Sequence, residues 1–490
     1  MNELATLMQP KQQKLNQPRI AIIGGGIAGA TAAVHAAELG FNVTLIEKGA
    51  GLVSGPPICH LHAGGNLYRE IDTEQCIELL KQSIDTVRLY PQTINQRPTI
   101  IAVPYSDGGS PDELYERLIT IQKCYTELVE DDPANKVLGE PNDYYRFYSR
   151  DELDLLAEKE QSSSPTTVDE WMIPFAKHAD LDSLKFPVVV VQEHGWSVFR
   201  IAASATLTLE ALPNCQLLTS TEVVGVQETE SGWKIECKDD LSRQQILDVD
   251  YLVNACGYET GAIDDFAQKP RQRLVEFKAA YVTQWQECEQ LWPEVIFHGP
   301  RGTPNGMAQL TPYPNGIFQL HGMTKDITLF EDGLVSSCKN SSQPELPTRL
   351  KRKIEAGWDE QVIIERSRKA IDHMSRFVPS YQSANEFGTP LFGAQQIPGK
   401  DDSLRAADVT FEGKHYARVE VVKGSSALEA AIKLIEHWNL FDYQGQTIES
   451  LHPVTMALTP QQVEEKAIEL AQERGYPIQL AQCYGENSKG

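Results

Sequence analysis

Three glycines near the start of the sequence have the spacing of a site that binds the phosphates of a dinucleotide. Gly24, Gly26 and Gly29 form G-x-G-x-x-G within IGGGIAG. The first permits a tight turn, the second lets the backbone approach a pyrophosphate, and the third allows close packing of a helix on a strand. Glu47 follows about 20 residues later, where an acid accepts hydrogen bonds from ribose hydroxyls. The neighbouring residues that we assign to the same site are Ile27, Ala28 and Lys48.

The segments around these glycines have the pattern of a strand, a helix and a second strand. Residues 19–23 form a short apolar run typical of a buried parallel strand. Small apolar residues over 28–39 predict a helix that Gly40 ends, and residues 42–46 predict the next strand. Because a glycine motif alone is weak evidence, the complete strand–helix–strand unit carries the prediction of a Rossmann-type fold.

The stretch SGPPICHLHAGGN, residues 54–66, gathers one cysteine and two histidines between prolines and glycines. Cys59, His60 and His62 could ligate a metal, attach a cofactor covalently or simply pack in a loop. They lack partners at ligand spacing elsewhere in the sequence, so we predict no metal site. Covalent attachment through His60 or His62 and an ordinary hydrogen-bonded imidazole both remain as interpretations.

A second candidate site lies far downstream, where a predicted strand over 417–422 runs into KGSS and then a helix. The unpaired N–H groups and the dipole at such a helix start stabilise anionic oxygen, in a phosphate or in a reduced flavin. An alternative is a capping box between Ser426 and Glu429, which would use only some of these N–H groups. The residues of this candidate site are Lys423, Gly424, Ser425 and Ser426.

Residues 217–226, 233–237 and 247–255 predict three consecutive strands, and the last of them runs into the sequence VNACG. With these segments the chain resembles the FAD-dependent oxidoreductases of the D-amino-acid oxidase type, which include the glycine and sarcosine oxidases. In that family a V-N-A-x-G element follows such a β-meander and lies beside the FAD.

The resemblance implies that FAD is the cofactor and that residues 54–66 line its isoalloxazine ring. It also implies that the downstream helix begins against the flavin and that the backbone near residue 223 meets the adenine. The residues that it adds to the cofactor site are His62, Ala63, Gly64, Gly65, Val223, Val224, Ala255 and Gly257.

The predicted fold class is α/β: a Rossmann-type FAD-binding domain, glutathione-reductase-like, with an interleaved α+β substrate domain built on a mixed sheet. Because the cofactor segments are far apart in the chain, we expect the FAD-binding domain to be discontinuous. Thr459 and Pro460 predict the start of a late helix. The predicted boundaries are 18–75, 193–268 and 385–440 for the FAD-binding domain, 76–192 and 269–384 for the substrate domain, and 441–490 for a C-terminal helical extension.

Oxidation of an amine or alcohol by a flavin requires few protein groups, chiefly a cation for an anionic substrate and a positive charge near the reduced flavin. Arg405 offers a bidentate fork for a carboxylate, or a salt bridge to a nearby aspartate. Lys423 favours flavin electrostatics or oxygen activation, whereas His321 is also compatible with a packed histidine in a sheet. The catalytic candidates are Lys423, Arg405, His321, Tyr313 and Arg301.

We therefore expect an FAD-dependent oxidoreductase that takes a hydride from the carbon bearing an amine in a small substrate and passes the electrons to oxygen or another acceptor. The alternatives are a 2-hydroxy-acid or quinone-linked FAD dehydrogenase, a tRNA-modifying flavoprotein and a flavin-binding protein without catalysis.

The composition restricts the binding partners and the cellular compartment that we expect for the protein. A formal charge of −24 opposes binding to nucleic acid. The sequence has no run of about 20 apolar residues for a membrane span. We expect no secretory signal, because residues 1–18 lack an apolar region behind a basic start. Its nine cysteines are scattered and include no C-x-x-C, which favours a reducing compartment. We predict a cytoplasmic protein.

Overall fold

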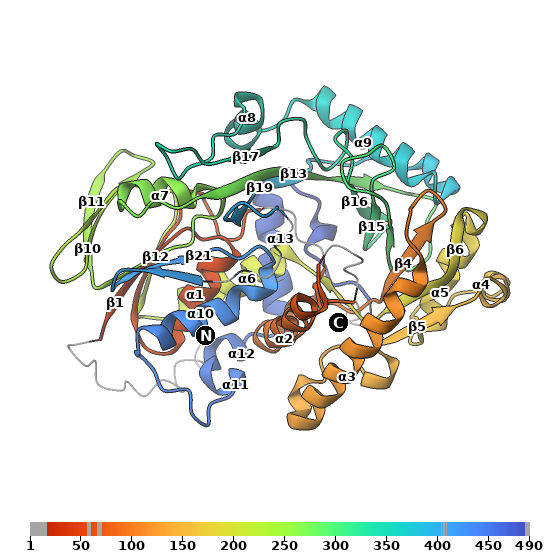
Figure 1. Ribbon diagram of the computed structural model, residues 1–490, viewed down its shortest axis with the longest axis horizontal. Coiled ribbons are helices and arrows are strands. Elements are labelled where there is room, and N and C mark those ends of the chain that lie inside the picture. The colour runs from red at the N-terminus through yellow and green to blue at the C-terminus, as the bar shows by residue number, and fades with distance from the viewer. Residues whose placement is uncertain are drawn as a thin grey trace.

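The computed structural model describes residues 17–55, 60–65, 71–402, 404, 407 and 409–485. Two large β-sheets lie side by side, and helices pack against both of them (Figure 1). Strands of the first sheet come from the beginning, the middle and the end of the chain, so the sheet forms only when distant segments meet. Within the described residues, no helix is long and apolar enough to cross a membrane.

The first sheet has six strands in the order β20-β21-β12-β1-β2-β8. All neighbours are parallel except β20 and β21. Helix α1 (Ile27–Glu38) follows β1 and packs against α6 (Val198–Ala211) and α10 (Ala427–His437). The predicted Rossmann-type unit is confirmed. The strands are β1 Arg19–Ile23, β2 Asn42–Ile46, β8 Cys215–Leu218, β12 Tyr251–Asn254, β20 Val409–Glu412 and β21 Tyr416–Val419.

The prediction of three strands over residues 217–255 is wrong, because this stretch forms five strands in two sheets. After β8 the chain turns at Ser220, where φ is +47°, and enters a separate three-stranded sheet. Asp250 lies at the second change of sheet, between β11 and β12. Hydrophobic patterning does not reveal where a chain passes from one sheet to another. The strands of the small sheet are β9 Thr221–Glu228, β10 Trp233–Asp239 and β11 Gln244–Val249.

The second large sheet has ten strands, eight of them in the order β17-β13-β16-β15-β14-β4-β6-β5. Strands β18 and β19 also pair with β13. Because β4 and β14 are parallel and other neighbours are antiparallel, the predicted mixed sheet is confirmed. The strands are β4 Thr99–Pro104, β5 Tyr145–Tyr148, β6 Leu184–Val191, β13 Arg273–Gln284, β14 Glu294–Phe297, β15 Ala308–Tyr313, β16 Ile317–Gly322, β17 Leu334–Ser336, β18 Asn385–Glu386 and β19 Leu391–Pro398.

Helices pack against the second sheet, and others lie beside the first sheet. Helix α9 packs on β13 and β16, while α2 lies against both α3 and α10. Strands β3 (Ile94–Asn95) and β7 (Gly195–Trp196) form a short separate pair. The domain boundaries drawn from the sequence stay a prediction. These helices are α2 Thr73–Leu89, α3 Tyr115–Asp131, α4 Arg150–Ala157, α5 Val168–His178, α8 Thr348–Ala356 and α9 Glu360–Met374.

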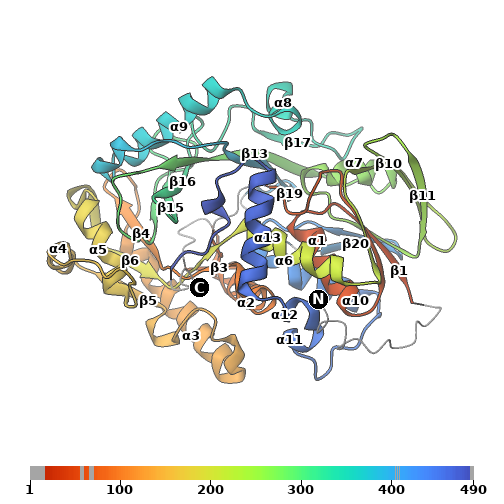
Figure 2. The same ribbon diagram turned by 180° about the vertical axis from the view of Figure 1, so that it is seen from behind.

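The C-terminal segment packs on the first half of the molecule. Helix α13 (Pro460–Glu473) lies beside α6, as Figure 2 shows, and Thr459 caps it as predicted. Beyond the helix, Arg474 donates to the backbone oxygens of Leu52 at 2.5 Å and Val53 at 3.0 Å. The amide of Val53 in turn donates to the oxygen of Gly25 at 2.9 Å. The end of the chain therefore supports the glycine-rich turn at its beginning. Two short helices, α11 Ile448–Leu451 and α12 Pro453–Met456, precede α13.

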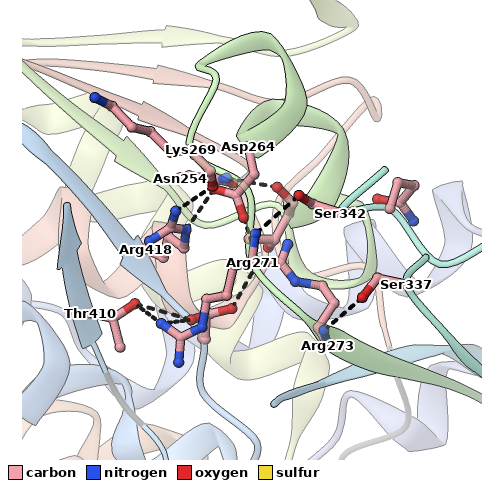
Figure 3. A network of polar contacts seen from close by, with 12 residues as sticks. Asn254, Asp264, Lys269, Arg271, Arg273, Ser337, Ser342, Thr410 and Arg418 are labelled. Carbon is pink, nitrogen blue, oxygen red and sulfur yellow. Dashed lines mark hydrogen bonds and ion pairs between the residues drawn. The ribbon is translucent and has the colours of Figure 1, made fainter. Parts of the chain in front are cut away.

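A buried ion network fastens the two large sheets together (Figure 3). Asp264, on α7 (Thr260–Phe266), pairs with Arg273 of β13 and lies 2.6 Å from Nε of Arg418 in β21. Glu420 lies 3.3 Å from Arg273 and adds a second carboxylate. All four residues are at most 1% exposed. Because buried charges are stable only with partners, each charge here depends on the others.

Candidate cofactor and substrate site

A cavity of about 710 Å³ is lined by residues of both large sheets. Its lining includes the carboxyl ends of β1, β2, β12 and β21, which is where ligands bind in parallel α/β sheets. Strands β13, β15, β16 and β19 of the second sheet supply the opposite wall. The volume lies within the range of roughly 300–1,000 Å³ typical of small-molecule and cofactor sites.

The glycine-rich turn forms one end of this cavity. Gly24 has a φ of +97°, and a Cβ there would lie 2.5 Å from the oxygen of Ala255. A Cβ at Gly29 would lie 1.8 Å from the oxygen of Gly24, so this glycine allows α1 to pack on the turn. A Cβ at Gly26 would have no heavy atom within 4 Å. Gly26 thus opens onto the cavity, directly before the first amides of α1, where a phosphate would be stabilised.

Glu47 and Lys48 follow β2 and line the cavity beside this turn. The carboxylate of Glu47 accepts hydrogen bonds from the amides of Gly25 and Gly49, both at 2.6 Å, and these fix its orientation. Lys48 pairs with Glu259. Although burial lowers it, Glu259 and Tyr258 raise the pKa of Lys48, so its ammonium stays charged.

The V-N-A-x-G element forms the adjoining wall. Asn254 donates to the oxygen of Thr260 and to the hydroxyl of Tyr416, both at 2.9 Å, and so holds the turn after β12. Ala255 and Gly257 line the cavity, as do Val223 and Val224 on β9. Their contacts with FAD remain a prediction.

The junction between β21 and α10 lies further along the cavity. Lys423, Gly424 and Ser425 line it, whereas Ser426 does not. Nζ of Lys423 lies 3.0 Å from Nε2 of His62. A Cβ at Gly424 would lie 2.8 Å from the ring of Trp196, so the absence of a side chain permits this close packing.

The alternative of a capping box between Ser426 and Glu429 is wrong. No side-chain hydrogen bond caps α10. Instead, the hydroxyl of Ser426 donates to Oε1 of Gln82 at 2.5 Å, and Nε2 of Gln82 donates to Glu429. A glutamine from α2 therefore separates the two expected partners, and local sequence spacing could not reveal this long-range contact.

The loop of residues 54–66 is only partly described, and Cys59 and residues 56–58 and 66 lie outside the described residues. Ala63, Gly64 and Gly65 are not among the residues that line the cavity. A Cβ at Gly64 would lie 2.5 Å from the oxygen of Cys76 in α2, and the amide of Gly65 donates to Glu193 at 2.5 Å. Packing within the protein thus explains these glycines, and their contact with FAD stays a prediction.

His60 and His62 both line the cavity, and their rings meet edge to face with centroids 4.4 Å apart. Nδ1 of His60 lies 2.6 Å from Oε1 of Glu294, which also accepts from Gln309 at 2.7 Å. Arg97 pairs with the other carboxylate oxygen. Although burial acts to raise it, Arg97 and His60 lower the pKa of Glu294 to about 2. The ionised carboxylate therefore holds the His60 ring in place. Covalent attachment through either histidine stays a prediction.

Two of the five catalytic candidates, His321 and Lys423, line the cavity. Nε2 of His321 accepts from the side-chain amide of Gln319 at 2.8 Å. Tyr313 is buried outside the cavity lining and donates to Oε1 of Gln319 at 3.0 Å. Arg301 is 39% exposed, pairs with Glu276 and does not line the cavity. Arg405 lies outside the described residues.

The polar residues of the second sheet were missed by the sequence analysis, because they belong to no motif. Lys278 could have been identified from the sequence, because it is a single charged residue within the otherwise apolar run FKAAYV. In the described part of the chain, no cluster of three histidine, cysteine or acidic side chains could hold a metal ion. The missed residues on this wall are Lys278, His298, Gln309, Gln395 and Gln396.

Comparison with known proteins relates the whole arrangement to one family. The family model described as "FAD dependent oxidoreductase" matches residues 19–387, which is most of the chain. No curated protein sequence matches this chain.

Solved structures share the fold at low sequence identity. L-proline dehydrogenase from P. horikoshii is 16% identical, with a TM-score of 0.52 over 90% of this chain and 98% of that chain. Glycine oxidase from Geobacillus kaustophilus is 13% identical, with a TM-score of 0.51 over 88% and 99%. L-amino acid deaminase from Proteus vulgaris is 12% identical, with a TM-score of 0.55 over 91% and 96%. At these sequence identities the similarity is evidence for a shared fold.

Proposed function

The chain belongs to the family of FAD-dependent oxidoreductases, and from this premise we propose that it oxidises the C–N bond of a small amine or amino acid. The protein is thus an enzyme with FAD as its cofactor. In the proposed reaction a hydride leaves the carbon that bears the nitrogen, and the electrons pass to oxygen or another acceptor. One observation carries the proposal: a continuous cavity leads from the glycine turn, past Lys423, to polar side chains of the second sheet.

The residues along the cavity fit FAD. The open space at Gly26 suits a pyrophosphate, and the fixed carboxylate of Glu47 suits a ribose. We propose that the backbone of Val223 faces the adenine and that Gly424 lies against the flavin. When bound there, FAD supplies a two-electron acceptor beside the substrate.

We propose that Lys423 stabilises the negative charge of the reduced flavin. Its ammonium can only donate a hydrogen bond, so Nε2 of His62 accepts from it at 3.0 Å. This contact requires an imidazole whose Nε2 carries no proton. The two side chains together place one positive charge at the junction.

We expect Lys423→Met to make the midpoint potential of bound flavin more negative and to slow its reduction by substrate about 10- to 100-fold, because a charge stabilising the reduced state is lost. Spectroelectrochemistry and stopped-flow absorbance measure the two effects. Lys433→Met is the matched control, since Lys433 lies on the same segment, pairs with Glu429 and does not line the cavity. A midpoint potential equal in the two variants would contradict the role of Lys423.

The proposed substrate class is tested by mixing the FAD-loaded protein anaerobically with amino acids, N-methyl amines and 2-hydroxy acids and recording the flavin absorbance. We expect an amine or amino acid to bleach the flavin and to yield the corresponding carbonyl product and free amine. Bleaching by hydroxy acids alone would reject the C–N substrate. Oxygen uptake with peroxide release, compared with turnover on quinones, then identifies the electron acceptor.

A further inference from the structure

Arg474, which directly follows α13, holds the backbone of the loop after β2. Its two terminal nitrogens donate to the oxygens of Leu52 at 2.5 Å and Val53 at 3.0 Å. Leu52 and Val53 are both 1% exposed, and buried backbone oxygens require hydrogen-bond partners. Because the donors of a guanidinium lie in one rigid plane, this side chain fixes two successive peptide groups relative to each other.

Val53 has a backbone conformation that a β-branched residue adopts only under constraint. Its φ is +52°, in the left-handed region. The amide of Val53 donates to the oxygen of Gly25 at 2.9 Å, and the oxygen of Val53 accepts from Arg474. Such a conformation persists only where the surrounding structure over-determines it. Gly25 and Arg474 therefore hold Val53 from its two sides, and loss of Arg474 would release one of them.

Gly25 connects this loop to the part of the cavity in which we place the pyrophosphate and the ribose. It directly precedes Gly26, and its amide donates to Oε2 of Glu47 at 2.6 Å. A Cβ at Gly25 would lie 2.6 Å from Cδ2 of Leu52, so the Leu52 side chain packs directly on the glycine-rich turn. The turn and the carboxylate of Glu47 thus both depend on residues that Arg474 holds.

The C-terminal segment around Arg474 is anchored outside this loop. Helix α13 packs along α6, and the guanidinium carbon of Arg474 lies 5.7 Å from the centre of the Phe199 ring on α6. The ring of Tyr476 also contacts Phe199, with centroids 5.6 Å apart. The hydroxyl of Tyr476 donates to the oxygen of Pro390, directly before β19, at 3.0 Å. Arg474 therefore reaches the loop from a support that does not itself depend on the loop.

From this chain of contacts we infer that Arg474 is a positioning residue for the ADP half of FAD. Arg474 does not line the cavity, so it acts through Leu52, Val53 and Gly25 on the turn and on Glu47. The inference gives the C-terminal segment a part in cofactor binding. It rests on the proposed placement of FAD and does not depend on the substrate being an amine.

The inference is tested by calorimetric titration of the apoprotein with FAD and, separately, with ADP, which carries the pyrophosphate and the ribose but no flavin. We expect Arg474→Met to raise the Kd for both ligands about 10- to 100-fold, because hydrogen bonds from a charged donor that order the turn are lost. Arg474→Lys should raise it only about 3- to 10-fold, since an ammonium replaces part of the planar fork. The midpoint potential of bound flavin should equal that of the wild type in both variants.

Tyr476→Phe is the matched control, because it removes a hydrogen bond from the same segment without contacting the loop. We expect its Kd for ADP to stay within about 3-fold of the wild type. Near-ultraviolet circular dichroism and urea titration identify conditions in which each apoprotein is fully folded. Under those conditions a loss of stability alone leaves the Kd unchanged, so the titration reports the geometry of the site.

A folded Arg474→Met variant with wild-type affinity for ADP and FAD, or an equal loss of affinity in Tyr476→Phe, would overturn the inference. If Arg474→Met does not fold, wild-type affinity in Arg474→Lys would overturn it. A changed midpoint potential with an unchanged Kd would also do so, because it would place the effect of Arg474 at the flavin. Weakened ADP binding in Arg474→Met, together with a flavin that no amine reduces, would support the role of Arg474 while rejecting the proposed C–N substrate.

Discussion

Gly26→Val should abolish the retention of FAD while the apoprotein stays folded. The β-carbon of Gly26 would enter open cavity space, and its φ of −62° is accessible to any residue, so the fold tolerates the change. The added methyl groups occupy the space in which the pyrophosphate approaches the backbone. We expect the Kd for FAD to rise at least about 100-fold, or about 2.7 kcal/mol, in a fluorescence titration of the apoprotein.

Gly29→Ala is the informative comparison for this experiment. Its β-carbon would lie 1.8 Å from the oxygen of Gly24, so we expect the variant to lose both FAD and apoprotein stability in urea. Gly26→Val should change the free energy of unfolding of the apoprotein by no more than about 1 kcal/mol. Wild-type affinity for FAD in Gly26→Val would mean that the pyrophosphate does not pass this turn.

Asp264→Ala should destabilise the protein by about 3–5 kcal/mol, the usual effect of removing one partner from a buried ion pair. Asp264 is fully buried and holds both Arg273 and Arg418, so its loss leaves two buried guanidinium groups with fewer carboxylates. Urea titration followed by tryptophan fluorescence measures the effect.

The neighbouring Asp265→Ala controls for the loss of a carboxylate from the same helix. Asp265 is largely solvent-accessible and accepts from the hydroxyl of Ser341 at 2.6 Å and the amide of Ser342 at 2.8 Å. We expect it to cost about 1 kcal/mol, the typical net contribution of hydrogen bonds of this kind. Equal effects of the two substitutions would show that the buried network does not fasten the sheets.

The strand–helix–strand unit at the start of the chain could be predicted almost to the residue, because each of its signals is local. An apolar run, the glycines at 24, 26 and 29 and the stop at Gly40 all act through neighbouring backbone. The same local reading failed at residues 217–255, where apolar strands continue on both sides of Ser220 and Asp250 but belong to different sheets.

The cavity wall that the second sheet supplies could not be predicted, because its contacts join residues that are far apart in the sequence. Glu294 meets His60 and Arg97 only after β14 has paired with β4. Gly64 and Gly65 illustrate a subtler limit. A glycine indicates that another group approaches the backbone closely, but the sequence does not say which group. The structure shows α2 at Gly64 and the side chain of Glu193 at Gly65.

The support that Arg474 gives to the loop after β2 has a consequence for biosynthesis. The glycine turn emerges from the ribosome several hundred residues before β21, the Lys423 junction and Arg474. Since N-terminal segments fold first during translation, the glycine turn forms before the Lys423 junction is made and before Arg474 supports the loop. We therefore expect FAD to load only after Arg474 has been synthesised, so that synthesis of the glycine turn and capture of the cofactor are separate events.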